Sequence, residues 1–153
     1  MVNTKPQNKP LNILLADDDK DDCFFFEKAL GELSIATHLI IVNNGEELME
    51  YLTGETGFFP DIIFLDISMP RKTGFECLSE IKENDRLKDV PVVMFTISFP
   101  HNKEFETNLK KTLTAMGAHS YISKNSDFNN LKQVIQEALT AVTEKKQEEA
   151  NNI

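Results

Sequence analysis

The chain has 153 residues, 25 of them acidic and 16 basic, and a net charge of −9 at neutral pH. This length fits one domain with a single core, and the acidic balance, without any basic patch, argues against a nucleic-acid surface. The N-terminal residues MVNTKPQNKP lack an apolar run and no later run reaches the roughly 20 residues of a membrane span, so we expect a cytoplasmic protein that does not enter a membrane.

Cysteine and histidine residues give no sign of a metal centre. The two cysteines, Cys23 and Cys77, have neither a CxxC spacing nor histidine neighbours, so we interpret them as reduced packing residues and expect no zinc site. His38, His101 and His119 are not clustered in the sequence. We interpret them as structural or exposed residues.

Apolar runs and amphipathic stretches alternate along the chain. Runs that are apolar on both faces or rich in β-branched residues predict strands, and apolar positions at helical spacing predict helices between them. In chain order these are a polar, disordered lead-in at 1–10, a strand at 11–16, a helix at 20–33, a strand at 39–42, a helix around 48–52, a strand at 62–66, a helix at 74–83, a strand at 90–97, a helix at 105–116 with Gly117 after it, a strand at 120–123, a helix at 128–142 and a solvated tail at 144–153.

This alternation predicts the fold class. Five strands alternate with five helices, and the sequence shows no internal repeat and no linker between domains. Such a pattern is typical of an α/β domain with a doubly wound parallel sheet, right-handed crossovers and helices on both faces, as in flavodoxin-like proteins. We place this domain at residues 11–143.

Polar side chains stand where four of the predicted strands end. Asp17 and Asp18 follow the first strand, Asp66 ends the third, Thr96 lies at the end of the fourth and Lys124 follows the fifth. The carboxyl ends of parallel strands meet at one edge of a sheet, so these groups should lie together. Three close carboxylates repel one another and favour a divalent cation. Oxygen ligands favour Mg²⁺, because it tolerates several waters and few protein ligands.

The same set of groups suits a phosphoryl group. A metal ion and Lys124 can neutralise phosphoryl oxygens while Thr96 donates a hydrogen bond. Asp66 can then be the nucleophile and form an acyl phosphate. Each residue alone has an ordinary explanation, such as a loop residue, an acidic helix start or a solvated lysine. Their combination at strand ends is what indicates chemistry.

Four segments in this order, ILLADDDKDD, DIIFLDISMPRKTGFE, PVVMFTIS and AHSYISK, resemble the response regulator receiver domain of two-component signalling. The resemblance covers about residues 11–142. It implies that Asp66 is the phosphoacceptor and takes a phosphoryl group from a sensor histidine kinase or a histidine phosphotransfer protein. It also implies that Asp18, Asp66 and the backbone carbonyl of Ser68 bind Mg²⁺, with Asp17 acting mainly through a metal-bound water.

The resemblance further implies a conformational switch. Lys124 would pair with the phosphoryl oxygens, Thr96 would move toward them, and Tyr121 matches the aromatic residue whose burial accompanies that movement. The fourth helix, fifth strand and fifth helix would form the face that changes, contacts a downstream protein target and could join a homodimer. Nothing after Val142 could fold as an output domain, so we expect a stand-alone switch. It would catalyse its own phosphorylation and dephosphorylation without being a metabolic enzyme.

Departures from the family pattern occur near the predicted site. Asn125 follows Lys124 where proline is usual, often after a cis bond, and a cis bond before another residue costs roughly 2.5–4 kcal/mol. We therefore predict a trans bond here, or a strained cis bond that repositions the next loop. Ile97 replaces a small residue, and residues 99–101 look inserted. These departures leave open a degenerate receiver that binds partners without phosphorylation.

An enzymatic alternative is a phosphatase of the haloacid-dehalogenase type, with Asp17 as nucleophile and Asp19 as general acid. Against it, the residue after Asp19 is lysine in place of the usual threonine or valine, and no second acidic pair follows Lys124 on another strand. A calcium loop beginning at Asp17 is rejected, because Asp22 and Lys28 stand where such a loop needs glycine and a bidentate glutamate.

Overall fold

The computed structural model describes residues 9–54, 58–96, 102–124 and 127–152, with the backbone alone at Thr96. Within these ranges five strands alternate with five helices, in the predicted order. The elements are β1 Leu11–Ala16, α1 Lys20–Gly31, β2 Thr37–Val42, α2 Gly45–Thr53, β3 Ile62–Asp66, α3 Gly74–Glu83, β4 Val92–Thr96, α4 Lys103–Ala115, β5 Ser120–Ser123 and α5 Phe128–Asn151.

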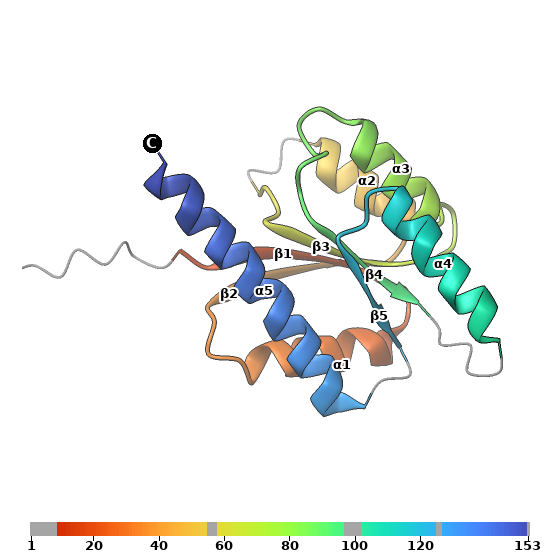
Figure 1. Cartoon of the computed structure of the whole chain (residues 1–153), viewed down its shortest axis with the longest axis horizontal. Coiled ribbons are helices and arrows are strands. Elements are labelled where there is room, and N and C mark those ends of the chain that lie inside the picture. The colour runs from red at the N-terminus through yellow and green to blue at the C-terminus, as the bar shows by residue number, and fades with distance from the viewer. Residues whose placement is uncertain (1–8, 55–57, 97–101, 125–126, 153) are drawn as a thin grey trace, which may run out of the picture.

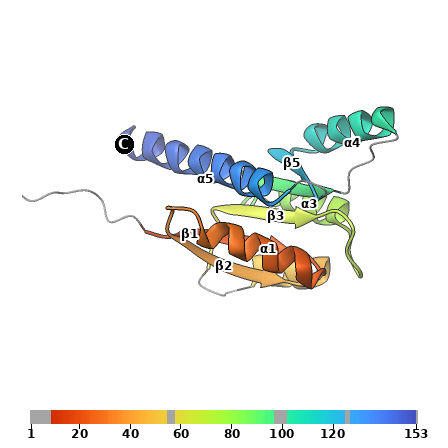
Figure 2. The same ribbon diagram turned by 90° about the horizontal axis from the view of Figure 1, so that it is seen from below.

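The strands form one parallel sheet in the order β2-β1-β3-β4-β5. Helices α1 and α5 cover one face of the sheet, and α2, α3 and α4 cover the other (Figure 1). Figure 2 shows the molecule from below, with α1 turned toward the viewer. The predicted doubly wound α/β fold is therefore confirmed. Strand β3 lies at the centre of the sheet and all of its residues are buried, which explains why its sequence is apolar without alternation.

Aromatic packing fixes α1 on one face of the sheet. The ring of Phe26 in α1 lies 4.8 Å from the ring of Phe64 and 5.9 Å from the ring of Phe95, both in edge-to-face arrangements. Phe26 and Phe64 are fully buried. Such pairs add to the stability that burial alone provides. The middle of α1 is thus held against β3 and β4.

The helix ends follow local sequence signals. Asp19 caps α1, because its Oδ1 accepts hydrogen bonds from the backbone N–H groups of Asp21 and Asp22 at 2.8 and 3.1 Å. Thr73 and Glu76 form a capping box at the start of α3. Gly117 follows the end of α4 with a φ of 101°, in the left-handed region, as its predicted position after the helix requires.

Helix α5 is longer than its apolar pattern indicates. It continues from Val142 to Asn151, and residues 144–151 are exposed. Lys146 forms an ion pair with Asp61, which stands directly before β3. The segment expected to be a solvated tail is therefore exposed but helical as far as Asn151.

The cysteines and histidines occupy ordinary positions. Cys23 and Cys77 are free, and burial raises the pKa of each thiol to about 11, which suits packing residues. His38 and His119 are exposed.

No helix in the described ranges has the length and apolar character to span a membrane. The predictions for residues 1–8, 97–101, including His101, and for the bond between Lys124 and Asn125 lie outside the described residues.

Gly74 brings the start of α3 against the end of β3. A Cβ atom there would lie 2.4 Å from the backbone oxygen of Asp66 and 2.7 Å from the Cα of Ile67. We expect Gly74→Ala to lower the free energy of unfolding by about 2–3 kcal/mol, because backbone atoms must move. Urea denaturation measures this. Gly31→Ala is the control, since a Cβ at Gly31 meets nothing within 4 Å. Equal losses in the two variants would contradict the prediction.

Candidate functional site

Three aspartates meet at the carboxyl edge of the sheet. Asp17 directly follows β1, and Asp66 ends the neighbouring strand β3. Carboxylate oxygens of Asp17, Asp18 and Asp66 all lie within 4.8 Å of one another. Asp17 and Asp66 are only 1% and 2% exposed, whereas Asp18 is exposed. The structure thus brings together the three carboxylates that the sequence placed at strand ends.

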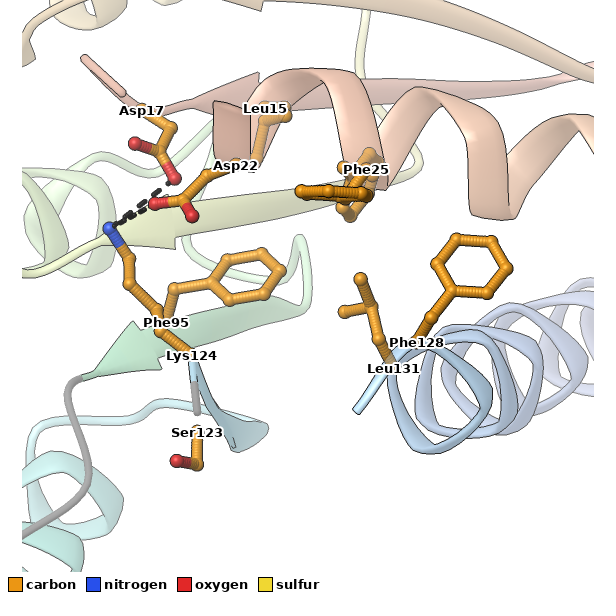
Figure 3. Close-up of a pocket in the computed structure, with 10 residues that line it drawn as sticks. Leu15, Asp17, Asp22, Phe25, Phe95, Ser123, Lys124, Phe128 and Leu131 are labelled. Atoms are coloured by element: carbon orange, nitrogen blue, oxygen red, sulfur yellow. Dashed lines mark ion pairs between the residues drawn. The ribbon is translucent and has the colours of Figure 1, made fainter. Parts of the chain in front are cut away.

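Lys124 connects this cluster to β5 and α1. Its Nζ lies 2.9 Å from Oδ2 of Asp66 and 3.5 Å from Oδ2 of Asp17. It also lies 2.8 Å from Oδ2 of Asp22, a residue that sequence reasoning did not select for the site. Figure 3 shows the Lys124 side chain reaching toward Asp17 and Asp22 from the end of β5. One ammonium group is therefore shared by three carboxylates.

Backbone N–H groups orient the two buried carboxylates. Oδ1 of Asp66 accepts a hydrogen bond of 3.1 Å from the N–H of Ser68, and Oδ1 of Asp17 accepts one of 2.9 Å from the N–H of Asp19. Each aspartate thus bonds the backbone two residues further along, as aspartates in turns commonly do. In each carboxylate the other oxygen, Oδ2, faces Lys124.

Burial shifts the protonation of these groups. Loss of hydration raises the pKa of Asp17 to about 7, and the charge of Asp66 adds to this, while the Asp19 N–H and Lys124 oppose it. Loss of hydration also raises the pKa of Asp66, against the hydrogen bond from Lys124. Burial lowers the pKa of Lys124, but its bonds to Asp22 and Asp66 outweigh this and the net pKa is raised. Burial therefore favours the protonated forms of Asp17 and Asp66, although the ammonium group of Lys124 opposes this in both.

The donor set fits a hard divalent cation. Every side-chain donor in the cluster is a carboxylate oxygen, and Asp18 keeps one side of the cluster open to water. Oxygen donors with access to water suit Mg²⁺ and Mn²⁺. A cation there would also relieve the repulsion between the buried carboxylates. Asp17, Asp18 and Asp66 are therefore suited to hold such an ion.

A pocket of about 330 Å³ opens beside Lys124, between α1 and α5. Figure 3 shows charged side chains at one end of it and aromatic side chains toward the other. The charged end consists of Asp17, Asp22 and Lys124, and the apolar wall includes Phe25, Phe26, Phe95, Phe128 and Leu131. Asp22 thus borders both the pocket and the carboxylate cluster.

The two predicted switch residues lie on β4 and β5. Thr96 is the last residue of β4 and pairs with Ser123 of β5 through the backbone, whereas its side chain lies outside the described atoms. Tyr121 is half-buried against the core on the α4 side of the sheet. The Nζ of Lys110 lies 4.6 Å from the centroid of its ring. A switch through these residues stays a prediction.

Comparison with known proteins identifies the family. The family model for the response regulator receiver domain matches residues 13–136. The chain belongs to this family. A receiver relative, the response regulator Rcp1 from Synechocystis sp., is 32% identical over 135 residues, which cover 84% of this chain and 86% of Rcp1.

Solved receiver structures agree with this assignment. The Mn²⁺-bound form of Rcp1 superposes with a TM-score of 0.69 at 30% identity, and the match covers 84% of this chain and 91% of that one. The phosphorylated cyanobacterial phytochrome response regulator RcpA also gives a TM-score of 0.69 at 30% identity, covering 85% of this chain and 91% of that one.

Membership of the receiver family bears on the alternatives. Receiver domains bind Mg²⁺ or Mn²⁺ at an acidic pocket, and this chain has such a cluster of aspartates. Receiver domains are phosphoacceptor switches that interact with histidine kinases and phosphotransfer proteins. The phosphatase alternative needs Asp19 as a general acid, whereas here Asp19 caps α1. The family match and the capping role of Asp19 both favour a receiver over the phosphatase.

Proposed function

We propose that this receiver domain works in a two-component phosphorelay and accepts a phosphoryl group on Asp66 from a sensor histidine kinase or a histidine phosphotransfer protein. The placement of Asp66 carries the proposal. Its carboxylate is buried at the end of β3, its Oδ2 lies 2.9 Å from Lys124 Nζ, and it shares the 4.8 Å cluster with Asp17 and Asp18. A nucleophile, a fixed cation and oxygen ligands for a metal ion are thus side by side.

In the transfer, a carboxylate oxygen of Asp66 attacks the phosphorus and the bond from phosphorus to the histidine nitrogen breaks. The leaving imidazole takes a proton from solvent. Lys124 neutralises charge on the phosphoryl oxygens, and the N–H of Ser68 holds the Asp66 carboxylate in one orientation. Dephosphorylation is a separate hydrolysis, in which water adds to the phosphorus, the bond to Asp66 breaks and inorganic phosphate is released.

When it is bound, Mg²⁺ supplies positive charge to the phosphoryl oxygens in addition to that of Lys124. Asp18, Asp66 and the backbone carbonyl of Ser68 would hold it directly, and Asp17 would act mainly through a metal-bound water. The carboxylate cluster and the raised pKa of its two buried members support this assignment. The protein is then a cytoplasmic switch that catalyses its own phosphorylation and dephosphorylation.

The output is contact with a downstream protein. In this proposal the receiver domain at residues 11–143 responds through Thr96, which moves toward the phosphoryl group, and through Tyr121. The half-buried position of Tyr121 between α4 and the core is consistent with two ring positions. The face formed by α4, β5 and α5 then binds the target or a second copy of the chain.

Intact mass after incubation with acetyl phosphate and Mg²⁺ tests the phosphoacceptor. We expect the wild type to gain one phosphoryl group and Asp66→Asn to gain none. Asp61→Asn, at the opposite end of β3, is the matched control and should still be modified.

Other outcomes of this measurement separate the alternatives. An adduct that survives Asp66→Asn but disappears in Asp17→Asn would indicate phosphatase-like chemistry. No adduct on the wild type, under conditions that modify a known receiver, would favour a degenerate receiver that only binds partners.

A further inference from the structure

The third carboxylate that binds Lys124 comes from the first turn of α1. Oδ2 of Asp22 lies 2.8 Å from Lys124 Nζ, as close as the 2.9 Å to Asp66. The Asp22 side chain is 34% exposed, so it reaches the ammonium group from the solvent side of the site. Its backbone N–H donates a hydrogen bond to the capping Asp19, and Phe26, one turn later in α1, packs against Phe64 of β3. Asp22 is thus held in place beside the lysine.

Asp22 differs from the other site carboxylates in what it contacts. Within the described ranges, the group of acidic residues that could share one cation contains Asp17, Asp18 and Asp66, but not Asp22. An ammonium group has three protons to donate, and here three carboxylates surround it. A phosphoryl group on Asp66 would need the same ammonium group. Asp22 therefore competes with the phosphoryl group for Lys124.

We propose that Asp22 is a positioning residue that holds Lys124 between itself and Asp66 and thereby limits how tightly the site binds a phosphoryl group. The inference rests on the proposed function. In the unphosphorylated protein Asp22 keeps a long, flexible side chain within reach of Asp66. Once Asp66 carries a phosphoryl group, the Asp22 charge still attracts the lysine and repels the phosphoryl oxygens.

Removal of this charge should strengthen the binding of a phosphoryl-like anion without strengthening the binding of a cation. Asp22→Asn keeps the size of the side chain and an oxygen that can accept from Lys124. We expect it to bind beryllofluoride, a mimic of the phosphoryl group, about three- to tenfold more tightly than the wild type in saturating Mg²⁺, from the Coulomb energy of one charge near the protein surface. Binding of Mn²⁺ alone should be unchanged or weaker. A merely structural defect would weaken both.

Isothermal titration calorimetry of the wild type, Asp22→Asn and Asp21→Asn measures both ligands. Asp21 carries the same charge one residue earlier on α1, and its side chain is exposed, so Asp21→Asn controls for net charge. It should change the affinity for beryllofluoride by less than about twofold, because water and salt screen an exposed charge.

Three results would overturn the inference: unchanged or weaker beryllofluoride binding in Asp22→Asn, an equal gain in Asp21→Asn, or no binding by the wild type. The first two leave the proposed function standing if the wild type binds beryllofluoride. The third removes both, provided that the wild type also takes no phosphoryl group from acetyl phosphate.

Discussion

Lys124→Met is expected to lower the free energy of unfolding of the metal-free protein by about 3–5 kcal/mol at pH 8. The substitution leaves Asp17 and Asp66 charged, buried and without their shared ammonium partner. At pH 5.5 the loss should be much smaller, because burial raises the pKa of both carboxyls and they can take up protons. Urea denaturation followed by circular dichroism, with EDTA present, measures the difference.

A surface lysine provides the control for this variant. Lys132 forms an ion pair of 3.2 Å with Glu32, and both side chains are partly exposed. We expect Lys132→Met to change stability by less than about 1 kcal/mol at either pH. A Lys124→Met loss that is the same at pH 5.5 and pH 8, or no larger than the control, would contradict the electrostatic explanation.

Asp17→Asn is expected to stabilise the metal-free protein by about 1–3 kcal/mol at pH 8. The pKa of Asp17 rises from 3.8 to about 7 on folding, so the folded protein binds more protons between these values. The stability that this group contributes is present below about pH 4 and is lost as the pH rises toward 7. Asparagine does not ionise, so the variant avoids that loss. The gain should be much smaller at pH 4.5 than at pH 8.

Mg²⁺ should reverse the order of the two proteins. A ligand stabilises the folded state more when it binds more tightly, so the wild type should gain more than Asp17→Asn, which lacks one oxygen ligand of the cluster. Melting temperatures in EDTA and in Mg²⁺ measure both effects. Asp85→Asn is the control, since that side chain is 99% exposed. An Asp17→Asn variant that is less stable than the wild type in EDTA at pH 8 would contradict the expected stabilisation.

The fold was predictable because its signals are local and repeated. The apolar run of β3, unbroken by polar residues, predicts a central buried strand, and the structure places it there with every residue buried. The cluster was predictable from topology, because parallel strands bring their carboxyl ends to one edge. Their positions at the ends of strands were enough to predict that four residues lie together: Asp17, Asp18, Asp66 and Lys124.

Asp22 was missed because its partner is distant in the sequence. Its one local signal was that it stands four residues after Asp18, in the first turn of α1, where acidic residues are common. Only the tertiary structure brings Lys124 to it. The end of α5 was missed because the apolar face ends at Val142, although the glutamate, lysine, glutamine and alanine residues that follow favour helix.

Helix α5 runs from the carboxyl edge of the sheet, near Lys124, to the opposite edge, near Asp61. The helix has 24 residues and begins a few positions after Lys124, and its ion pair between Lys146 and Asp61 holds its far end at the start of β3. At 1.5 Å per residue it spans about 36 Å. A fluorophore, affinity handle or surface linker joined after Asn151 would therefore stand away from Asp66. Protein immobilised in this way would offer its acidic edge freely to a phosphodonor in solution, whereas attachment through the first turn of α1 would obstruct it.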